Sequence, residues 1–511
     1  MDSIFASQDF LHPQISVQTQ AFFRMAYGLL LAATLLWALP HWRRFFLSER
    51  WGGYSKSARD VDFIQNPIIA PILGAVWFLC AVLITLGWWS IGAAFLNLLL
   101  CRYFFVRMRW KGVQRGMGAP GFMTYWLAAA VLLLEYTLKY APSGELRSLA
   151  LLVLQVDFAF IMLSAGIYKL TAGYARNHGM EGGMVNPEWG YWWRFFARRS
   201  PHSWIFKILN QLAWSTEVFA GMLMLIPQTR FLGALLILFS FIFIATQIRL
   251  GLLCEMVIVC CLLFFYPGSY GDQFLSAIMP AASAASSYAI TSEAPAAVAV
   301  GGRLALFNQL LAAALRAYLV LLPLSHAGLF YNFYARKRLP APLQRALEVY
   351  TNFFGIIIWR VFSVDVVNFF ILIHRRPRTD DGGGGERDLI SRYGLGGGLR
   401  YSHVGESITV TSLFTTLKYY PSNDELFRER LLRYAGTLAC PEDCVLDFEY
   451  VSVRKAEDHF DFVTVAEYTV DPYAGTIEER VLNEIVSVRA AHPASPVHEG
   501  ARPGSYAPLK G

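Results

Sequence analysis

The chain has 511 residues, of which 55% are hydrophobic and 16% are charged, with a formal net charge of +7. Soluble domains carry about 25% charged residues, and disordered chains combine low hydrophobicity with high charge, so both classes are excluded. The 7 cysteines lack framework spacing, which excludes a disulfide-stapled secreted fold, and the positive charge comes without a nucleic-acid motif, so we expect no nucleic-acid partner.

Predicted membrane-spanning segments fill most of the first 325 residues. A helix needs roughly 20 mainly apolar residues to cross a bilayer. Nine segments qualify: 22–39, 68–86, 91–106, 122–138, 146–170, 208–226, 231–248, 250–266 and 304–324. Residues 1–21 lack the basic region of a cleavable signal peptide, and we expect an extracytoplasmic N-terminal segment there. The pattern predicts an all-α polytopic membrane helix bundle of about nine transmembrane helices over residues 22–325.

Lysine and arginine are unevenly distributed among the predicted loops. They cluster at 43–59, 102–115, 176–207 and 336–345, whereas the loop 268–302 has none. Because cytoplasmic loops collect these residues, the alternation predicts an N-terminus outside and a cytoplasmic C-terminus. The Ala- and Arg-rich, Lys-poor composition indicates a bacterial inner membrane, with membrane lipids as partners.

The segment 350–374 is apolar and long, but Arg360 and Asp365 lie near its middle. A charge at the bilayer centre costs about 2.5–3.5 kcal/mol on insertion scales. We therefore predict an amphipathic interfacial helix within a helical segment over 326–379. A tenth span is the alternative, and it would move the C-terminal domain to the other side.

The remaining chain has the pattern of a small soluble domain. A Gly-rich linker over 380–388 leads into a predicted cytoplasmic α+β domain over 389–490, and 491–511 reads as a disordered tail. Its predicted elements are strands at 406–420, 445–454 and 461–470 and a helix at 424–439. Cys440 and Cys444 have no second pair nearby, so we interpret them as structural and predict no metal site.

Ionisable side chains within spans are rare and tend to be functional. We single out seven: Arg24, Glu135, Asp157, Lys169, Glu217, Arg249 and Glu255. A buried Lys169 loses proton affinity and is a candidate catalytic base, although snorkelling to the interface is the alternative. Glu217 needs a proton or a partner, and its candidate partners are Lys169, Arg24 and Arg249. Asp157 and Tyr168 are eleven residues apart, about three turns, so they share one helix face.

The loop after the fifth predicted span is rich in aromatic and basic residues. It contains Trp189, Tyr191, Trp192, Trp193 and Trp204 with Arg194, Arg198 and Arg199. Aromatic residues form a belt at the membrane–water boundary, which is the simplest interpretation. The same mixture could also frame a lipid headgroup, a quinone or a partner protein.

Several segments together resemble the HTTM superfamily, the membrane domain of vitamin K-dependent gamma-carboxylases. They are FFRMAYGLLLAATLLWALPHWRRFFLSERWGG, ITLGWWSIGAAFLNLLLCRYFF, AGIYKL (165–170) and IIIWRVFSVDVVNFFI. The resemblance covers about residues 20–375, and lipase maturation factors share a similar order. It implies that Lys169 stands where the carboxylases place the base that deprotonates vitamin K hydroquinone. The chain departs from the family pattern at Tyr168, which replaces a lysine, and at ATQIR (245–249), where a histidine is common.

Two functions are therefore expected. The first is an HTTM-like accessory, maturation or assembly factor for another membrane or exported protein. The alternative is a membrane enzyme related to the carboxylases, with Lys169 and Glu217 as catalytic residues and a quinone or lipid as cofactor. The predicted cofactor contacts are Asp157, Tyr168, Trp189, Trp192, Trp193 and Arg194.

Overall fold

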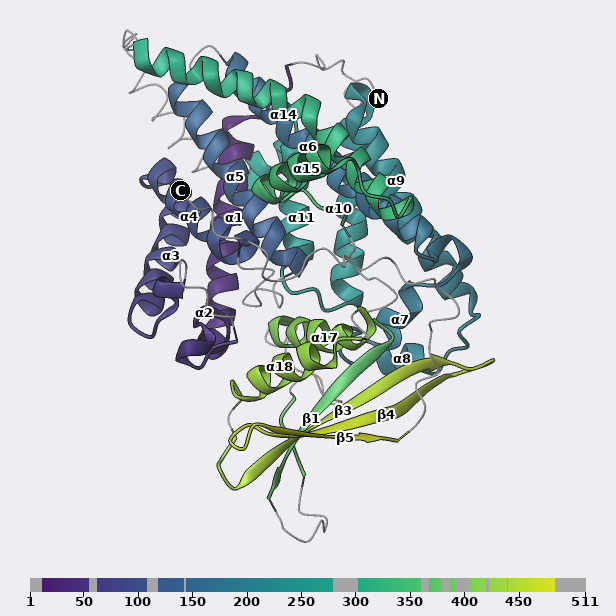
Figure 1. The fold of residues 1–511 in the computed structure, drawn as a ribbon. Coiled ribbons are helices and arrows are strands. Elements are labelled where there is room, and N and C mark those ends of the chain that lie inside the picture. Colours follow the sequence, from purple (N-terminus) through teal and green to yellow (C-terminus); the bar gives the residue numbers. More distant parts are fainter. Residues whose placement is uncertain are drawn as a thin grey trace.

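The computed structural model describes residues 12–54, 62–107, 118–141, 144–278, 302–359, 367–378, 387–391, 404–419, 422–438 and 440–482. Helices form a bundle in the first two thirds of the chain, and a sheet with two helices follows it (Figure 1). The predicted linker 380–388 lies almost wholly outside the described residues, and the tail 491–511 does so entirely.

Six long apolar helices mark the chain as an integral membrane protein. They are α1 (Val17–Ala38), α3 (Ile69–Leu86), α5 (Gly118–Tyr140), α6 (Glu145–Thr171), α10 (Arg230–Gln247) and α14 (Gly302–Tyr334). Helix α9 (Trp204–Leu225) has 22 residues and packs between α6 and α10, but it is too polar along its length to join the six.

Six of the nine predicted spans therefore correspond to long apolar helices among the described residues. The predicted spans 91–106 and 250–266 correspond to α4 (Ser90–Cys101) and α11 (Leu253–Cys261), which have 12 and 9 residues. At 1.5 Å per residue, helices of this length reach about 18 Å at most, short of a hydrocarbon core of about 30 Å. A π-helical and a 3-10 segment follow them, so hydropathy alone overestimated the length of regular helix.

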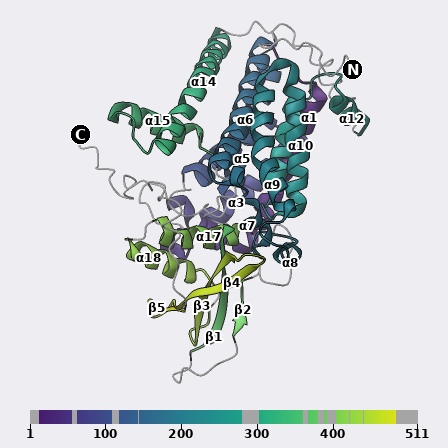
Figure 2. The ribbon, with the colours of Figure 1, turned by 90° about the vertical axis from the view of Figure 1, so that its right-hand side faces the viewer.

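The bundle has two distinguishable ends. At one end, Asp272 of α12 (Tyr270–Ile278) accepts hydrogen bonds from Ser16 and Thr19 at the start of α1. At the other end, Arg44 of α2 (Trp42–Phe46) pairs with Glu406 of the C-terminal domain at 3.1 Å. The start of α1 and the sheet thus lie at opposite ends of the bundle, as Figure 2 also shows.

The C-terminal domain is an antiparallel five-stranded sheet in the order β2-β1-β3-β4-β5. The strands are β1 (Phe369–Pro377), β2 (Asp388–Leu389), β3 (Cys444–Lys455), β4 (Phe460–Asp471) and β5 (Thr476–Val481). Helices α17 (Val404–Tyr419) and α18 (Asp424–Ala435) pack on one face around Phe414, Phe427 and Phe448. A bulge at Tyr450 and Val451 in β3 changes the register, and beyond it Val451 and Val453 join the core of the bundle.

Two segments differ from their predicted structure. The segment 406–420 is helix α17 and not a strand, because Val410, Leu413, Phe414 and Leu417 have helical spacing and pack on the sheet. The interfacial helix predicted over 350–374 is also wrong: α15 (Ala341–Phe354) ends early, and residues from Phe369 form β1. Arg360 and Asp365 lie outside the described residues. The other predicted elements are confirmed as α18, β3 and β4.

The remaining short helices lie at the junction between the bundle and the sheet. They are α7 (Met180–Val185) and α8 (Trp193–Ala197), preceded by the 3-10 turn Tyr174–Arg176. All three come from the glycine- and tryptophan-rich loop between α6 and α9. This loop therefore positions the C-terminal domain.

Candidate functional site

Lys169 and Glu217 form a buried ion pair between α6 and α9. Their Nζ and Oε1 atoms are 2.5 Å apart, and each residue is only 3% exposed. The snorkelling alternative for Lys169 is therefore wrong, and Lys169 is the partner that Glu217 required. Glycines bring the helices together here: a Cβ on Gly166 would lie 2.7 Å from the backbone nitrogen of Val218.

The other candidate partners of Glu217 are engaged elsewhere. Arg24 pairs with Glu135 at 3.6 Å and donates to the carbonyl of Ile84. Arg249 donates to the carbonyls of Pro187 and Gly190, so it holds the loop between α7 and α8. Lys169 therefore pairs with Oε1 of Glu217 at a buried position, while Oε2 has no hydrogen-bond partner among the described residues, and the arrangement is that of a structural ion pair.

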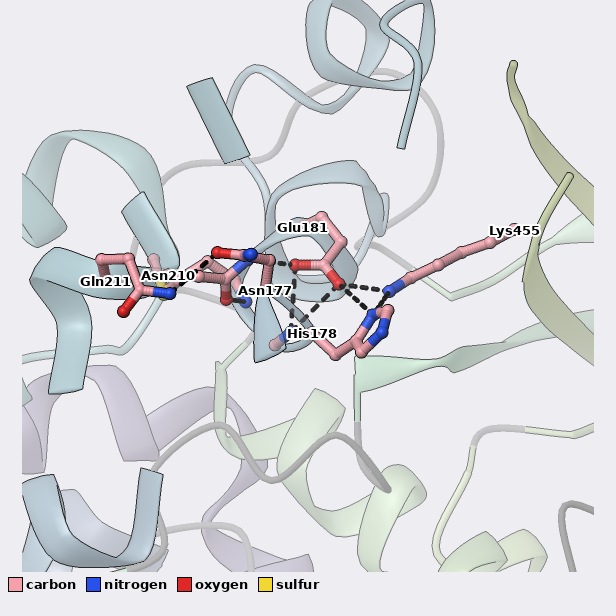
Figure 3. Close-up of polar contacts among 8 residues, drawn as sticks. Asn177, His178, Glu181, Asn210, Gln211 and Lys455 are labelled. Carbon is pink, nitrogen blue, oxygen red and sulfur yellow. Dashed lines mark hydrogen bonds and ion pairs between the residues drawn. The ribbon is translucent and has the colours of Figure 1, made fainter. Parts of the chain in front are cut away.

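A second buried carboxylate, Glu181 of α7, joins the bundle to the sheet (Figure 3). Both of its oxygens accept the backbone N–H of Gly179 at 3.0 Å, and Oε2 also accepts from Asn210 of α9 at 2.8 Å. Lys455, at the end of β3, completes the site with an ion pair to Oε1. The ammonium of Lys455 also lies 3.1 Å from Nδ1 of His178, and burial together with this positive charge lowers the pKa of His178.

Tyr174 lies between the two carboxylates. Its side chain is wholly buried, and Gly179 packs directly on its ring, where a Cβ would lie 2.4 Å from the nearest ring carbon. Burial raises the pKa of Tyr174 well above its usual value, and the nearby Glu217 and Glu181 raise it further.

A third carboxylate, Glu188, faces α17. Its Oε1 accepts the hydroxyl of Thr411 at 3.0 Å, while the neighbouring Asn186 donates to the carbonyls of Val367 and Phe369. Burial raises the pKa of Glu188 to about 8, although hydrogen bonds from Thr411 and Ser407 act in the opposite direction. This carboxyl is therefore protonated at neutral pH.

The predicted cofactor contacts of the aromatic loop do not converge on one site. Trp189 is buried, whereas Trp192 is 58% exposed and donates to the carbonyl of Thr246. Trp193 makes an edge-to-face contact with Phe462 of β4, and the guanidinium of Arg194 lies over the Trp193 ring at 5.4 Å. The contacts described for these four residues do not include Lys169 or Glu217, and Trp193 links the loop to the C-terminal domain.

Asp157 lies in a separate pocket between α5, α6, α14 and α15. Its Oδ2 accepts Nε1 of Trp126 and the hydroxyl of Tyr318, both at 2.9 Å. His326 lines the same pocket, and its buried Nε2 finds no hydrogen-bond partner among the described residues. The cavity is small, about 20 Å³, which is roughly the space that one water molecule needs.

The Asp157 pocket and the Lys169 pair are distinct. Twelve residues of α6 separate them, about 18 Å along the axis. Asp157 and Tyr168 both face α14, which agrees with the prediction that they share one helix face, but the Tyr168 ring contacts Phe333 and does not line the pocket. Sequence reasoning missed Glu181, Glu188, His326 and Lys455; the first two lie in the glycine-rich loop, whose unusual composition was the available signal.

Comparison with models of protein families, with curated proteins and with solved structures gives no match. The resemblance to the HTTM superfamily therefore stays a prediction. Function has to be argued from the geometry of these sites.

Proposed function

We propose that the protein is an accessory factor for the assembly or maturation of another membrane or exported protein. The observation that carries this proposal is the way the C-terminal domain is fixed to the bundle. Lys455 meets Glu181, Arg44 meets Glu406, and Asn186 holds the chain that enters β1. A soluble domain fixed at several buried points is suited to present a partner to the membrane helices in one orientation.

The sheet lies on the cytoplasmic side in this proposal. The described basic residues of the loops at its end of the bundle include Arg43, Arg50, Arg198 and Arg199, whereas α12 and the start of α1 lie at the other end. An excess of lysine and arginine marks cytoplasmic loops. The inner membrane of a bacterium remains the proposed location.

Lys169 has a structural role in this proposal. A general base must reach its substrate, whereas the Lys169 side chain is buried and its Nζ lies 2.5 Å from Glu217 Oε1. Exchange of both residues for apolar ones should therefore preserve function, whereas an enzyme that uses Lys169 would lose it.

The test is mass spectrometry of the full chain in a mild detergent, with bound polypeptides and bound small molecules read together. We expect one stoichiometric membrane or exported protein, retained by the double variant Lys169→Met/Glu217→Leu. A bound quinone without a protein partner would contradict the proposal. So would loss of function in a double variant that is folded.

The alternative is a membrane enzyme with a lipid or quinone cofactor, and the Asp157 pocket favours it. A buried carboxylate and an unpartnered imidazole nitrogen face an aromatic pocket in the apolar region, which is the pattern of a ligand site. The cavity must widen to admit such a molecule. In this case Asp157→Asn and His326→Gln should each remove the small molecule from the purified protein, and its retention would count against the enzyme.

A further inference from the structure

Helix α14 lies at one side of the bundle, next to α6 (Figure 2). Only 6% of its apolar stretch is buried, against 78% for α6. Its exposed face carries a charge, Arg316, that has no hydrogen bond or ion pair with any described residue. An exposed cation in an apolar helix needs an explanation, because charges within spans normally face the bundle interior or a partner.

Arg316 lies close to the middle of the membrane region. The hydrogen bond between Tyr318 and Asp157 places Tyr318 level with the middle of α6, which has 27 residues. Arg316 precedes Tyr318 by two residues, which is about 3 Å along the helix and about 200° around it. Its side chain therefore leaves α14 on the face turned away from α6, near mid-depth.

At this depth the Arg316 side chain is too far from the membrane surface for its guanidinium to reach water by snorkelling. Arginine reaches the interface from near a helix end, whereas mid-depth is about 15 Å from either boundary of the hydrocarbon core. The residues beside it are suited to a neighbouring helix: Ala313 and Ala317 are exposed on the same stripe, and small residues allow two helices to approach closely. Gln309, also exposed, adds a second polar group two turns before Arg316.

We propose that this face of α14 binds a membrane-spanning helix of a different protein, and that an Asp or Glu at mid-depth of that helix pairs with Arg316. The inference rests on the proposed accessory function and names the class of partner.

A second copy of this chain is a poor occupant of this face. Three carboxylates within its own long helices are engaged inside the bundle: Glu135 with Arg24, Glu217 with Lys169, and Asp157 in its pocket. A twofold dimer through this face would also bring Arg316 against its own copy.

The test is photo-crosslinking of the full chain in its native membrane, with a photoreactive residue in place of Ala313. We expect a crosslink to a spanning segment of one other protein that contains Asp or Glu. Arg316→Leu should reduce the yield by about tenfold, the factor that corresponds to 1.4 kcal/mol, and Arg316→Lys should retain most of it. Arg316→Glu should lose the crosslink, and an Arg at the partner's acidic position should restore it.

The matched control places the photoreactive residue at Phe239 of α10, which is exposed and apolar and has no charge beside it. Crosslinks there should reach lipid alone. The inference fails if Ala313 also yields lipid alone, a second copy of the chain, or a segment without an acidic residue, or if Arg316→Leu leaves the yield unchanged. A stoichiometric partner in mass spectrometry together with lipid alone at Ala313 would reject this inference and leave the accessory function standing.

Discussion

Replacement of Glu188 by Gln tests how the C-terminal domain is docked. The carboxyl group is buried between the α7–α8 loop and α17, and its hydrogen-bond partners are hydroxyl groups of Thr411 and Ser407. Burial raises its pKa from 4.5 to about 8. Once α17 separates from the loop, water reaches the carboxyl and its ordinary pKa returns. Docking therefore binds a proton at neutral pH.

The sign and size of the effect follow from this shift. A group whose pKa is raised in the docked state stabilises docking fully below pH 4.5 and loses that contribution as pH rises through about 8. Each pKa unit is worth about 1.4 kcal/mol. The rise from pH 7 to pH 9 should therefore weaken docking by about 1.4 kcal/mol, or tenfold, because the docked state stops binding the proton near pH 8. Glu188→Gln is neutral at every pH and does not have to take up a proton on docking. Its docking free energy at pH 7 should therefore be more favourable than that of the native chain by up to about 3 kcal/mol.

Hydrogen exchange of the α17 amides measures this opening equilibrium directly. After correction for the intrinsic exchange rate, protection of the native protein should fall about tenfold between pH 7 and pH 9, and that of Glu188→Gln should stay constant. Glu406→Gln is the matched control, since it removes a charge that is paired with Arg44 and should weaken docking at every pH. Constant protection in the native protein would refute the reasoning, as would a Gln variant that is less protected than the native chain at pH 9.

Three further changes test the packing. Lys169→Met should destabilise the fold by about 3–5 kcal/mol in thermal unfolding, and Lys169→Met/Glu217→Leu should recover most of the loss; failure to recover would mean that the pair does more than neutralise itself. Gly221→Val should force α6 and α9 apart and cost about 1–3 kcal/mol, whereas Gly74→Val in open space should be tolerated, and equal losses would contradict this account. Lys455→Met should leave its buried carboxylate uncompensated and reduce hydrogen-exchange protection in β3; unchanged protection would show that the contact does not hold the sheet.

The local hydrophobic pattern correctly predicted the elements whose periodicity fits either a strand or a helix but not both. Strands β3 and β4 and helix α18 fall in this group. The segment 406–420 was ambiguous, because its Thr-rich alternation also contains the spacing of Val410, Leu413 and Phe414. The segment is a helix because these residues then pack together on the sheet, which local sequence does not reveal. The end of α15 and the start of β1 could not be predicted either. They lie in a continuous apolar run, which has neither the helical nor the strand periodicity that separates the two structures.

The site was predictable only as far as single residues allow. Sequence identified Lys169 and Glu217 as charges that needed partners, and the fold made them partners of each other. Glu181 and Glu188 looked like ordinary loop carboxylates, because their partners in the C-terminal domain come much later in the chain: Lys455 lies 274 residues after Glu181 and Thr411 lies 223 residues after Glu188. Arg316 was overlooked although it lies within the predicted span 304–324, where the sequence alone marks it as a charge in an apolar run.

The contrast between Lys169 and Arg316 carries the functional argument. Both are cations within apolar helices, so both face the same cost of leaving water. For Lys169 the chain supplies a carboxylate within 2.5 Å, brought close by a helix contact that glycines permit. Arg316 has no such partner among the described residues, and it lies on the helix that the bundle covers least. Since the described residues satisfy one cation internally and leave the other exposed, the compensating charge for Arg316 is expected on a different molecule in the same membrane.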